Sequence, residues 1–265
     1  MPRFHLFEFE DQEWFPGALR NYLTDFLQFL SNSAKLYKPV IPVIQKGIKC
    51  SGSNRIVDLA SGGGGGLLWL NKELQKGIPG LRILLTDFYP NIDAFEFIKQ
   101  KSSTFEFVGE PVDARDVPKT LTGLRTQFLS FHHFRPEDAR KILQNAVNSK
   151  NPIAIFEAQE RSLPSFVAML LSPLTVWLAT PFIRPFSVGR LLFTYLIPIV
   201  PLFVMWDGFV SCLRTYSIKE MNALVDSLHD KETFDWDISK VPSGPTFVLY
   251  LLGTPKIKNP GSSGI

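Results

Sequence analysis

The sequence predicts an α/β protein built on a mostly parallel β-sheet, and two features support this prediction. From Arg55 onward, short apolar segments alternate with longer amphipathic ones, a pattern typical of strands and helices joined as βαβ units. Helices are then expected to cover both faces of the sheet. The second feature is composition, because 265 residues with 45% hydrophobic and 20% charged side chains suit one elaborated domain and exclude a disordered or collagen-like chain.

The expected elements of this core follow in order along the chain. Strands are predicted in the segments RIVDLA, LRILLTDF, FEFVGEPVDA, LRTQFLSF and PIAIFEA, and helices are predicted to begin at Leu67, Asn91 and Pro136. A helix over 217–228 and two strand-like segments, FDWDI and TFVLYLLG, come last. The segment VPSGP between these strands predicts a closing β-hairpin.

The N-terminal region carries apolar side chains at helical spacing between Trp14 and Leu36, which predicts one or two amphipathic helices. Pro39 and Pro42 are expected to end the helical part. Trp14, together with Phe15, Arg20 and Tyr37, would then form a lid over a ligand site, with simple packing as the alternative. Acidic residues in MPRFHLFEFEDQEWF argue against a cleaved export signal, so we expect a cytoplasmic protein, peripheral to or anchored in a membrane if it meets one.

An apolar insertion interrupts the alternation. No residue from Ser162 to Ile183 is charged, and these 22 residues are followed by 16 more uncharged ones from Leu191. A helix of 22 residues would cross about 30 Å of hydrocarbon, but prolines recur throughout the insertion and favour several short helices. We expect a helical cap that binds an apolar substrate or contacts a membrane surface, while a two-helix membrane hairpin stays open as an alternative.

Charge and cysteine content exclude several classes of function. A net charge of +3 without a basic stripe gives no reason to expect a nucleic-acid partner. Two cysteines, Cys50 and Cys212, cannot form a disulfide framework, and the four histidines lack zinc-binding spacing. We therefore expect a reducing compartment and no metal. The oligomeric state cannot be predicted from these features.

The segment IVDLASGGGGG, which links the first strand to the first core helix, is the most informative motif. A flexible linker is a poor interpretation because the glycines lie between a buried strand and a helix. A phosphate-binding loop needs Lys and then Ser or Thr, but Leu67 and Leu68 stand there. A dinucleotide loop remains open, since Ala60, Gly62 and Gly65 approximate its glycine pattern. Asp58 favours a ligand with an ammonium group over a pyrophosphate.

These residues resemble a known family, the class I S-adenosylmethionine (SAM) dependent methyltransferases. The family's first motif is an acid followed by three alternating glycines, and here it is similar to Asp58, Ala60, Ser61, Gly62, Gly63 and Gly64, with Ala60 in place of the first glycine. The resemblance extends to Asp87 and Phe88 after the second strand, to Asp113 and Ala114 after the third, and to LRTQFLSFHHFRPEDARKIL. It implies a Rossmann-like, seven-stranded, mostly parallel sheet with a reversed seventh strand.

The resemblance also implies the roles of these residues toward SAM as cofactor. The glycine turn would lie against the methionine part, because a Cβ there would collide with it. Asp58 would bind the amino group, and Asp87, next to Phe88, would accept hydrogen bonds from the ribose hydroxyls. Asp113 and Ala114 would line the adenine. The alternatives are that Asp58 is a turn carboxylate and that Asp87 caps the helix near Asn91.

His132 and His133 follow the fourth strand, where loops of such folds face the substrate, and are the candidate catalytic pair. The alternative is that one packs and the other binds a backbone carbonyl. Glu157, at the end of the fifth strand, is placed on the substrate side together with Trp14. Methyl transfer needs alignment more than a base, so a general base is optional.

We therefore predict five parts: an N-terminal helical lid region (1–54), a SAM-binding core (55–161), an apolar helical cap insertion (162–210), a C-terminal helix and β-hairpin that complete the sheet (211–256), and a disordered tail (257–265). The predicted function is methyl transfer from SAM to a small-molecule acceptor, apolar or membrane-associated. An NAD(P)-dependent oxidoreductase on a similar fold and a catalytically silent SAM-binding membrane-associated protein are the two rival predictions.

Overall fold

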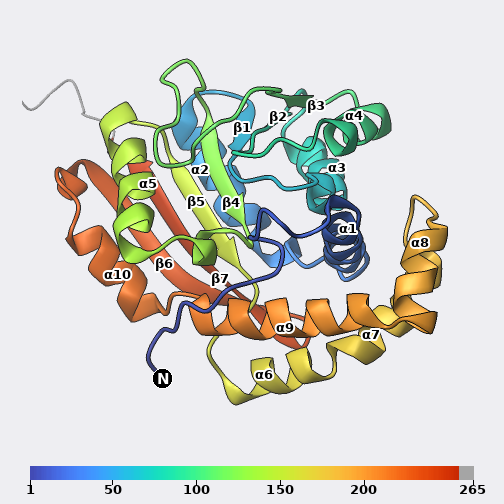
Figure 1. Ribbon diagram of the computed structural model, residues 1–265. Helices are drawn as coiled ribbons and strands as arrows, with labels where there is room; N and C mark the ends of the chain where they lie inside the picture. The colour runs from blue at the N-terminus through green and yellow to red at the C-terminus, as the bar shows by residue number, and fades with distance from the viewer. Residues whose placement is uncertain (257–265) are drawn as a thin grey trace, which may run out of the picture.

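The computed structural model describes residues 1–256 and contains one seven-stranded sheet in the order β3-β2-β1-β4-β5-β7-β6 (Figure 1). Strands β1 to β5 pair in parallel, β7 is antiparallel to both of its neighbours, and β6 therefore runs with the other five. The strands are β1 Arg55–Asp58, β2 Arg82–Leu85, β3 Phe105–Phe107, β4 Leu124–Phe128, β5 Ile153–Glu157, β6 Phe234–Ser243 and β7 Thr246–Pro255. The predicted α/β fold with a reversed seventh strand is confirmed.

Helices cover both faces of the sheet. Ile56 and Val57 point to opposite faces because successive strand residues alternate, and they belong to two different clusters of buried side chains. Helices α2 Ile41–Ser51, α3 Leu68–Gly77 and α4 Ile92–Lys101 pack on the face of Ile56, whereas α5 Pro136–Ser149 and α10 Ile218–Asp226 pack on the face of Val57. Pro136 opens α5, and Glu137 and Asp138 lie in its first turn, where acids interact favourably with the helix dipole.

Two expectations for this core were wrong. Pro39 and Pro42 do not end the helical part: each lies in the first turn of a new helix, the short 3-10 helix Lys38–Val40 and then α2. Proline is tolerated there because a first-turn N–H has no partner within the helix. Strand β3 ends at Phe107, so Asp113 and Ala114 lie in the following loop and not at a strand end.

The closing hairpin is longer than predicted. Pairing between β6 and β7 extends to Ser243 and Thr246, so most of the segment VPSGP belongs to β6. Gly244 alone takes the left-handed backbone that the turn requires, with φ of 58°.

The apolar insertion folds as a cap of short helices, α6 Leu163–Leu170, α7 Ser172–Ala179, α8 Val188–Leu191 and α9 Ile199–Arg214 (Figure 1). Val176 of α7 and Val204 of α9 pack with Leu23 and Phe26 of α1 Gly17–Ser33 in a third buried cluster. The cap is therefore joined to the N-terminal region. Among residues 1–256, no single helix has both the length and the apolar character of a membrane span, although two sharply bent helix pairs do when taken together.

Residues 1–16 form an extended segment, here called the N-terminal strap, that lies between α9 and the loop after β4. Asp207 of α9 accepts hydrogen bonds from the backbone N–H groups of Phe9 (2.7 Å) and Glu10 (3.2 Å). On the other side, Arg3 donates to the carbonyls of His132 and Phe134, at 2.9 Å each. The strap thus brings its acidic residues to the carboxyl ends of the strands.

Candidate active site

A cavity of about 310 Å³ opens at the carboxyl ends of β1, β2 and β4, the edge at which open parallel sheets bind ligands. Three core segments line it: the glycine turn after β1, Asp87 after β2, and the loop from Phe128 to Phe134. The N-terminal region closes the other side through Glu10, Asp11, Arg20, Thr24, Leu27, Gln28, Ser31 and Tyr37. Arg20 and Tyr37, two of the four expected lid residues, therefore reach the cavity.

The glycine turn is shaped by left-handed backbone. Ala60, Gly62 and Gly64 have φ of 55°, 55° and 69°, a conformation that costs a residue with a Cβ roughly 1–2 kcal/mol. A Cβ on Gly62 would meet nothing within 4 Å, so this glycine presents bare backbone to the cavity.

The other glycines have neighbours within the protein. A Cβ on Gly63 or Gly65 would collide with the side chain of Gln28 from α1, and one on Gly64 would lie 2.5 Å from Leu85 Cδ1. Close approach of a ligand is therefore a sufficient reason for glycine only at Gly62. At Gly63, Gly64 and Gly65, packing against Gln28 of α1 and Leu85 of β2 is an alternative reason, although the Gln28 side chain could move.

Asp58 ends β1 with its carboxylate buried, at 3% exposure. Its Oδ1 accepts a 2.7 Å hydrogen bond from Thr126 Oγ1 of the neighbouring strand β4. Burial raises the pKa of Asp58 to about 7, against the lowering effect of the hydrogen bonds from Thr126 and Ser61. Among the described residues, Asp58 caps no helix. It is a buried carboxyl group that lines the cavity and has a pKa close to neutral pH.

Asp87 joins the two turns that border the cavity. One carboxylate oxygen accepts from Gly62 N–H at 2.8 Å and the other accepts from Tyr89 N–H at 2.9 Å. Asn91 is the residue that caps α4, through its side-chain oxygen and Ala94 N–H, so Asp87 is free of that role. Burial raises the pKa of Asp87, although the backbone donors oppose this. Phe88 is 45% exposed, packs edge-on against Tyr89 and does not line the cavity.

Asp113 and Ala114 lie outside the cavity lining. The Asp113 carboxylate is held by Arg115, with Nη2 at 2.7 Å from Oδ2, and this hydrogen bond keeps the pKa of Asp113 below its usual value. Ala114 is buried in the core cluster on the α5 face. Their predicted adenine contacts remain a prediction.

The two histidines have different environments. His132 is 2% exposed, and Glu157 holds it twice, through His132 N–H at 3.0 Å and through Nδ1 at 2.9 Å. Gln159 Nε2 donates to Glu157 Oε2, the oxygen that faces His132 Nδ1, at 2.9 Å. Glu157 is thus buried and positions the loop after β4, whereas neither it nor His132 lines the cavity.

His133 does line the cavity, and its Nδ1 lies 2.9 Å from Asp11 Oδ1. Burial alone would lower the pKa of His133, but the negative charges of Glu8 and Asp11 outweigh it and raise that pKa to about 10. The ring is therefore charged at neutral pH and donates hydrogen bonds. Trp14 is 68% exposed, packs against Phe9 and Phe15, and lies away from the cavity.

Sequence reasoning missed the acids of the strap. Glu8, Glu10 and Asp11 were used only to argue against an export signal, yet Glu10 and Asp11 line the cavity and Glu8 is fully buried beside both histidines. The signal that could have found them is the concentration of acids in a segment too apolar to be a solvated tail, FHLFEFEDQEWF. With Asp58 and Asp87, the cavity has four acidic residues against two cationic ones, Arg20 and His133.

Comparison with known proteins agrees with this geometry at the level of fold. The reversed β7 between β5 and β6 is the sheet that the motif resemblance implies. The chain therefore has the Rossmann-like, seven-stranded sheet that the motifs imply. A scan of protein-family models and a search of curated proteins both found no match.

Several solved structures are similar in fold to this chain. Human N-acetylserotonin methyltransferase in complex with SAM is 14% identical, with a TM-score of 0.48 over 90% of this chain and 58% of that one. The plantazolicin methyltransferase in complex with S-adenosylhomocysteine (SAH) is 11% identical, with a TM-score of 0.49 over 90% and 98%. A mitomycin 7-O-methyltransferase is 15% identical, with a TM-score of 0.46 over 88% and 54%. The chain spans little more than half the length of N-acetylserotonin methyltransferase and of the mitomycin 7-O-methyltransferase.

Proposed function

We propose that this chain is a SAM-dependent methyltransferase of class I that acts on a small-molecule acceptor. One observation carries the proposal: Asp58 and Asp87 line the same cavity as the exposed backbone of Gly62. SAM has an ammonium group at one end, a ribose diol toward the other and a positive sulfonium between them. A cavity with two carboxylates and an open main-chain surface between them suits that distribution of charge and donors.

Each residue has a task that its position supports. Asp58 binds the amino group as a carboxylate, and its Oδ2, unlike Oδ1, is not committed to Thr126. Asp87 accepts from the ribose hydroxyls, because a carboxylate has lone pairs left after binding two N–H groups. Gly62 leaves the space between them open. When SAM is bound, its sulfonium supplies an activated methyl group.

The acceptor is proposed to enter from the side of Ser130, His133 and Phe134, which line the cavity after β4. His133, charged at neutral pH, orients an acceptor oxygen by donating a hydrogen bond, and it does not remove the proton. His132 and Glu157 act as positioning residues, because together they hold the loop that carries His133. Alignment of acceptor, methyl and sulfur is then the main contribution of the protein to the rate.

The rival function, NAD(P)-dependent oxidation, is disfavoured by charge. A pyrophosphate would have to lie beside Asp58, Asp87, Glu10 and Asp11, and would find only Arg20 and His133 as cationic partners in the cavity. Calorimetric titration of the purified chain with SAM, SAH and NADH separates the two proposals. We expect binding of SAM and SAH and no heat with NADH. Binding of NADH alone would replace the proposed function with the rival one.

A catalytically silent protein is the second rival, and it differs only in turnover. It would bind SAM and SAH in the same titration but would release no SAH when incubated with SAM and a panel of hydroxylated, amino and apolar acceptors. Formation of SAH with one acceptor, lost in Asp87→Ala and kept in Asp226→Ala, is the result that we expect from an enzyme. Asp226 is a suitable control because it is an exposed acid paired with Lys231.

We also propose that the acceptor is apolar or membrane-associated, because the outer face of the cap is suited to a lipid surface. This apolar cap face consists of exposed large side chains, among them Leu163 (76%), Val188 (72%), Leu196 (76%), Leu178 (66%) and Phe182 (67%). No acidic residue occurs from Ser162 to Trp206, and the only charges there are Arg184 and Arg190. Arg190 is buried and paired with Asp25, so Arg184 is the one charge that this segment exposes. An apolar surface with an exposed cation and no acidic residue suits an anionic membrane interface.

Two aromatic side chains on the same face support this proposal. Trp177 and Tyr195 are 49% and 41% exposed and pack on each other at 5.8 Å between ring centroids. Their polar groups are satisfied inside the cap, since Trp177 Nε1 donates to Thr194 O at 3.0 Å and Tyr195 Oη donates to Trp177 O at 2.7 Å. Trp and Tyr are enriched at membrane–water interfaces.

A further inference from the structure

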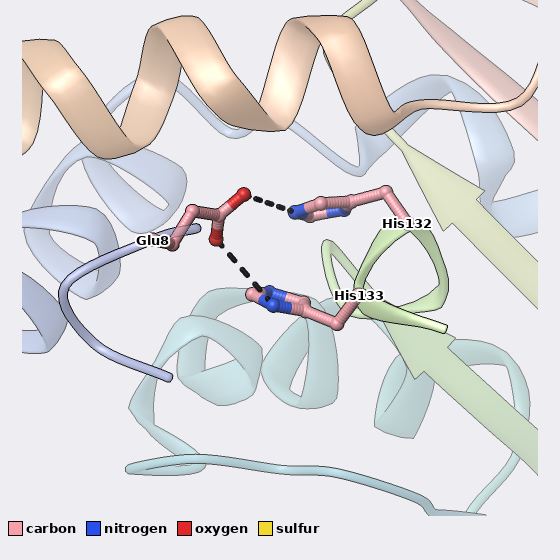
Figure 2. A group of neighbouring side chains, drawn as sticks. All are labelled: Glu8, His132 and His133. Carbon is pink, nitrogen blue, oxygen red and sulfur yellow. Dashed lines mark ion pairs between the residues drawn. The ribbon is translucent and has the colours of Figure 1, made fainter. Parts of the chain in front are cut away.

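Three side chains from two distant parts of the chain converge beside the cavity. Figure 2 shows Glu8 of the strap pointing at the rings of His132 and His133 from the loop after β4. Glu8 Oε1 lies 3.9 Å from His132 Nε2, and Glu8 Oε2 lies 3.4 Å from His133 Nδ1. One donor atom from each residue can be chosen so that all three lie within 4.8 Å of one another.

Two atoms of this cluster are buried without a hydrogen-bond partner: Glu8 Oε2 and His132 Nε2. Glu8 is 0% exposed and His132 is 2% exposed. A buried polar atom without a hydrogen-bond partner costs about 1–3 kcal/mol, so two of them in one side-chain cluster are unusual in a folded protein. A ligand that both atoms bind removes this cost.

The surroundings of His132 indicate what kind of ligand this is. Two groups approach Nδ1: Glu157 Oε2 at 2.9 Å and the amide Nε2 of Gln159 at 3.0 Å. In the tautomer that carries its proton on Nδ1, the ring donates to the Glu157 carboxylate and Nε2 keeps its lone pair. Histidines that bind metal ions almost always donate their other N–H to a carboxylate or carbonyl in this way. The second carboxylate oxygen of Glu157 binds His132 N–H at 3.0 Å and fixes the ring's place.

We propose that Glu8, His132 and His133 bind a divalent transition-metal ion, with Zn²⁺ as the best match. Two imidazoles and a carboxylate are ligands that Zn²⁺ accepts at about 2.0–2.2 Å each. Such bond lengths bring donor atoms to about 3.0–3.6 Å from one another. The two Glu8 distances involve different carboxylate oxygens, 3.9 Å from Oε1 to His132 Nε2 and 3.4 Å from Oε2 to His133 Nδ1. With one donor atom from each residue the three lie within 4.8 Å of one another, so the side chains must move closer together around the ion or Glu8 must bind it through both oxygens.

Arg214 is the competitor for the same acceptors. Its Nη1 lies 3.2 Å from Glu8 Oε1 and 3.3 Å from His133 Nδ1, but also 2.6 Å from Asp11 Oδ2. The Nε of Arg214 donates to Leu6 O at 2.8 Å. The guanidinium can therefore withdraw toward Asp11 and Leu6 when an ion takes Glu8 and His133, and ligation displaces any proton from His133 Nδ1.

The site has a structural consequence, because Glu8 belongs to the strap and both histidines belong to the core. An ion bound by all three fixes the strap over the cavity that His133, Glu10 and Asp11 line. Three protein ligands also leave a coordination position open.

The experiment titrates Zn²⁺ alone into the metal-free full chain by calorimetry and records visible absorption with Co²⁺. We expect one ion per chain, with a dissociation constant in the micromolar range or below, and Co²⁺ bands in the visible region. Neither measurement uses SAM, so the outcome is independent of the proposed function. A folded chain that takes up no Zn²⁺ and gives no Co²⁺ bands would overturn the proposal, even if it binds SAM.

Variants distinguish this site from adventitious binding by surface histidines. Glu8→Gln and His132→Gln should each weaken Zn²⁺ binding at least 100-fold, and Glu157→Gln should weaken it about 10- to 100-fold through the orientation of His132. His5→Gln removes a strap histidine that lies outside the cluster and should leave the affinity unchanged. If His132→Gln does not fold, Glu8→Gln on the extended strap decides alone. Equal affinities in Glu8→Gln and the wild type would contradict the assignment.

Discussion

Asp58 shows how a single residue connects stability to ligand binding. Its pKa is about 7 in the folded chain and about 3.9 when unfolded. Because the folded pKa is the higher one, the folded state holds the extra proton between these values, and stability falls as pH rises through this window. Above pH 7 the fold carries the full cost of a buried carboxylate. Buried acids with such raised pKa values occur most often at functional sites, where the charge binds a ligand.

We therefore predict that Asp58→Asn stabilises the protein and weakens its binding of SAM. At pH 8 the free energy of unfolding should rise by an amount on the order of 2 kcal/mol, and most of the gain should be lost near pH 4, where the folded carboxyl is protonated and the unfolded one is about half protonated. SAM affinity at pH 7.5 should fall at least tenfold. Urea denaturation at pH 8 and at pH 4 tests the predicted stability, and calorimetry tests the predicted loss of SAM affinity. A variant less stable than the wild type at pH 8 would show that Asp58 is a structural acid.

The charge of Asp58 also predicts a pH dependence of binding. Between pH 5.5 and 7 the dissociation constant for SAM should fall as pH rises, because Asp58 ionises in this range and then attracts the ammonium group. The slope should disappear in Asp58→Asn. If the wild-type dissociation constant for SAM does not change with pH over this range, Asp58 does not bind the amino group of the ligand.

Ala60 gives a prediction about backbone strain. It has φ of 55°, where a glycine avoids the cost of a Cβ. Ala60→Gly should raise the free energy of unfolding by about 0.5–1 kcal/mol, since relief of the left-handed cost exceeds the entropy gained by the unfolded chain. Ala139→Gly, in the buried interior of α5, should instead lower it by about 1 kcal/mol. Denaturant midpoints that move in the same direction for both variants would contradict this account of the turn.

Among the elements, the N-terminal strap depends most on contacts with distant parts of the chain. Asp207 is its anchor on α9, and burial raises the pKa of that carboxyl to about 7. We predict that Asp207→Ala releases the strap from α9. Hydrogen exchange at Phe9 and Glu10 should become at least tenfold faster, while exchange in β1 and β4 stays unchanged. Equal acceleration in the sheet would mean that the whole fold, and not the strap, is loosened.

The core elements could be predicted from the sequence because strands buried on both faces are nearly continuous apolar segments, as in RIVDLA and PIAIFEA. The start of α2 could not be predicted, because Pro42 can end a helix or begin one. Which of the two occurs depends on the residues that pack around it. The end of β3 was misplaced because the apolar alternation continues through Val108 and Val112, which bind β2 and its loop without forming a strand.

Most of the predicted residues that line the cavity come soon after strands; Arg20 and Tyr37 of the expected lid are the exceptions. Asp58, Gly62 and Asp87 were found because a strand end fixes their position at one edge of the sheet. Glu8 and Asp11 come from the strap, whose place depends on Asp207 and Arg214 far along the chain. The packing of Gln28 on Gly63 and Gly65 is likewise a tertiary contact, so the glycines were attributed to the ligand alone.

At the scale of the whole molecule, cap helices α7 and α9 lie next to α1 of the N-terminal region that closes the cavity (Figure 1). The cap also exposes many large apolar side chains. Exposed apolar patches on globular proteins commonly mark surfaces that bind membranes or partners. The cap lacks acidic residues from Ser162 to Trp206, which favours a lipid surface. The acceptor would then enter from the lipid.

We predict that the full chain floats with vesicles that contain one third anionic phospholipid. The double variant Leu178→Glu with Leu196→Glu should lose at least tenfold in the bound fraction, because two charges would enter the interface. Phe247→Glu, at a half-exposed apolar residue of the hairpin outside the cap, should bind as the wild type does. If the wild-type chain does not float with the vesicles and instead forms a dimer through the cap, the apolar face would be assigned to contact with a second copy of the chain.

The central claim is that a sulfonium nucleoside lies on the main chain of Gly62 between two carboxylates. The most direct measurement is a crystal structure of the chain with SAH. It should place the amino group within hydrogen-bond distance of Asp58 and both ribose hydroxyls on Asp87. A nucleoside found elsewhere, or a glycine turn that stays covered by Gln28 with SAH excluded from it, would contradict the account.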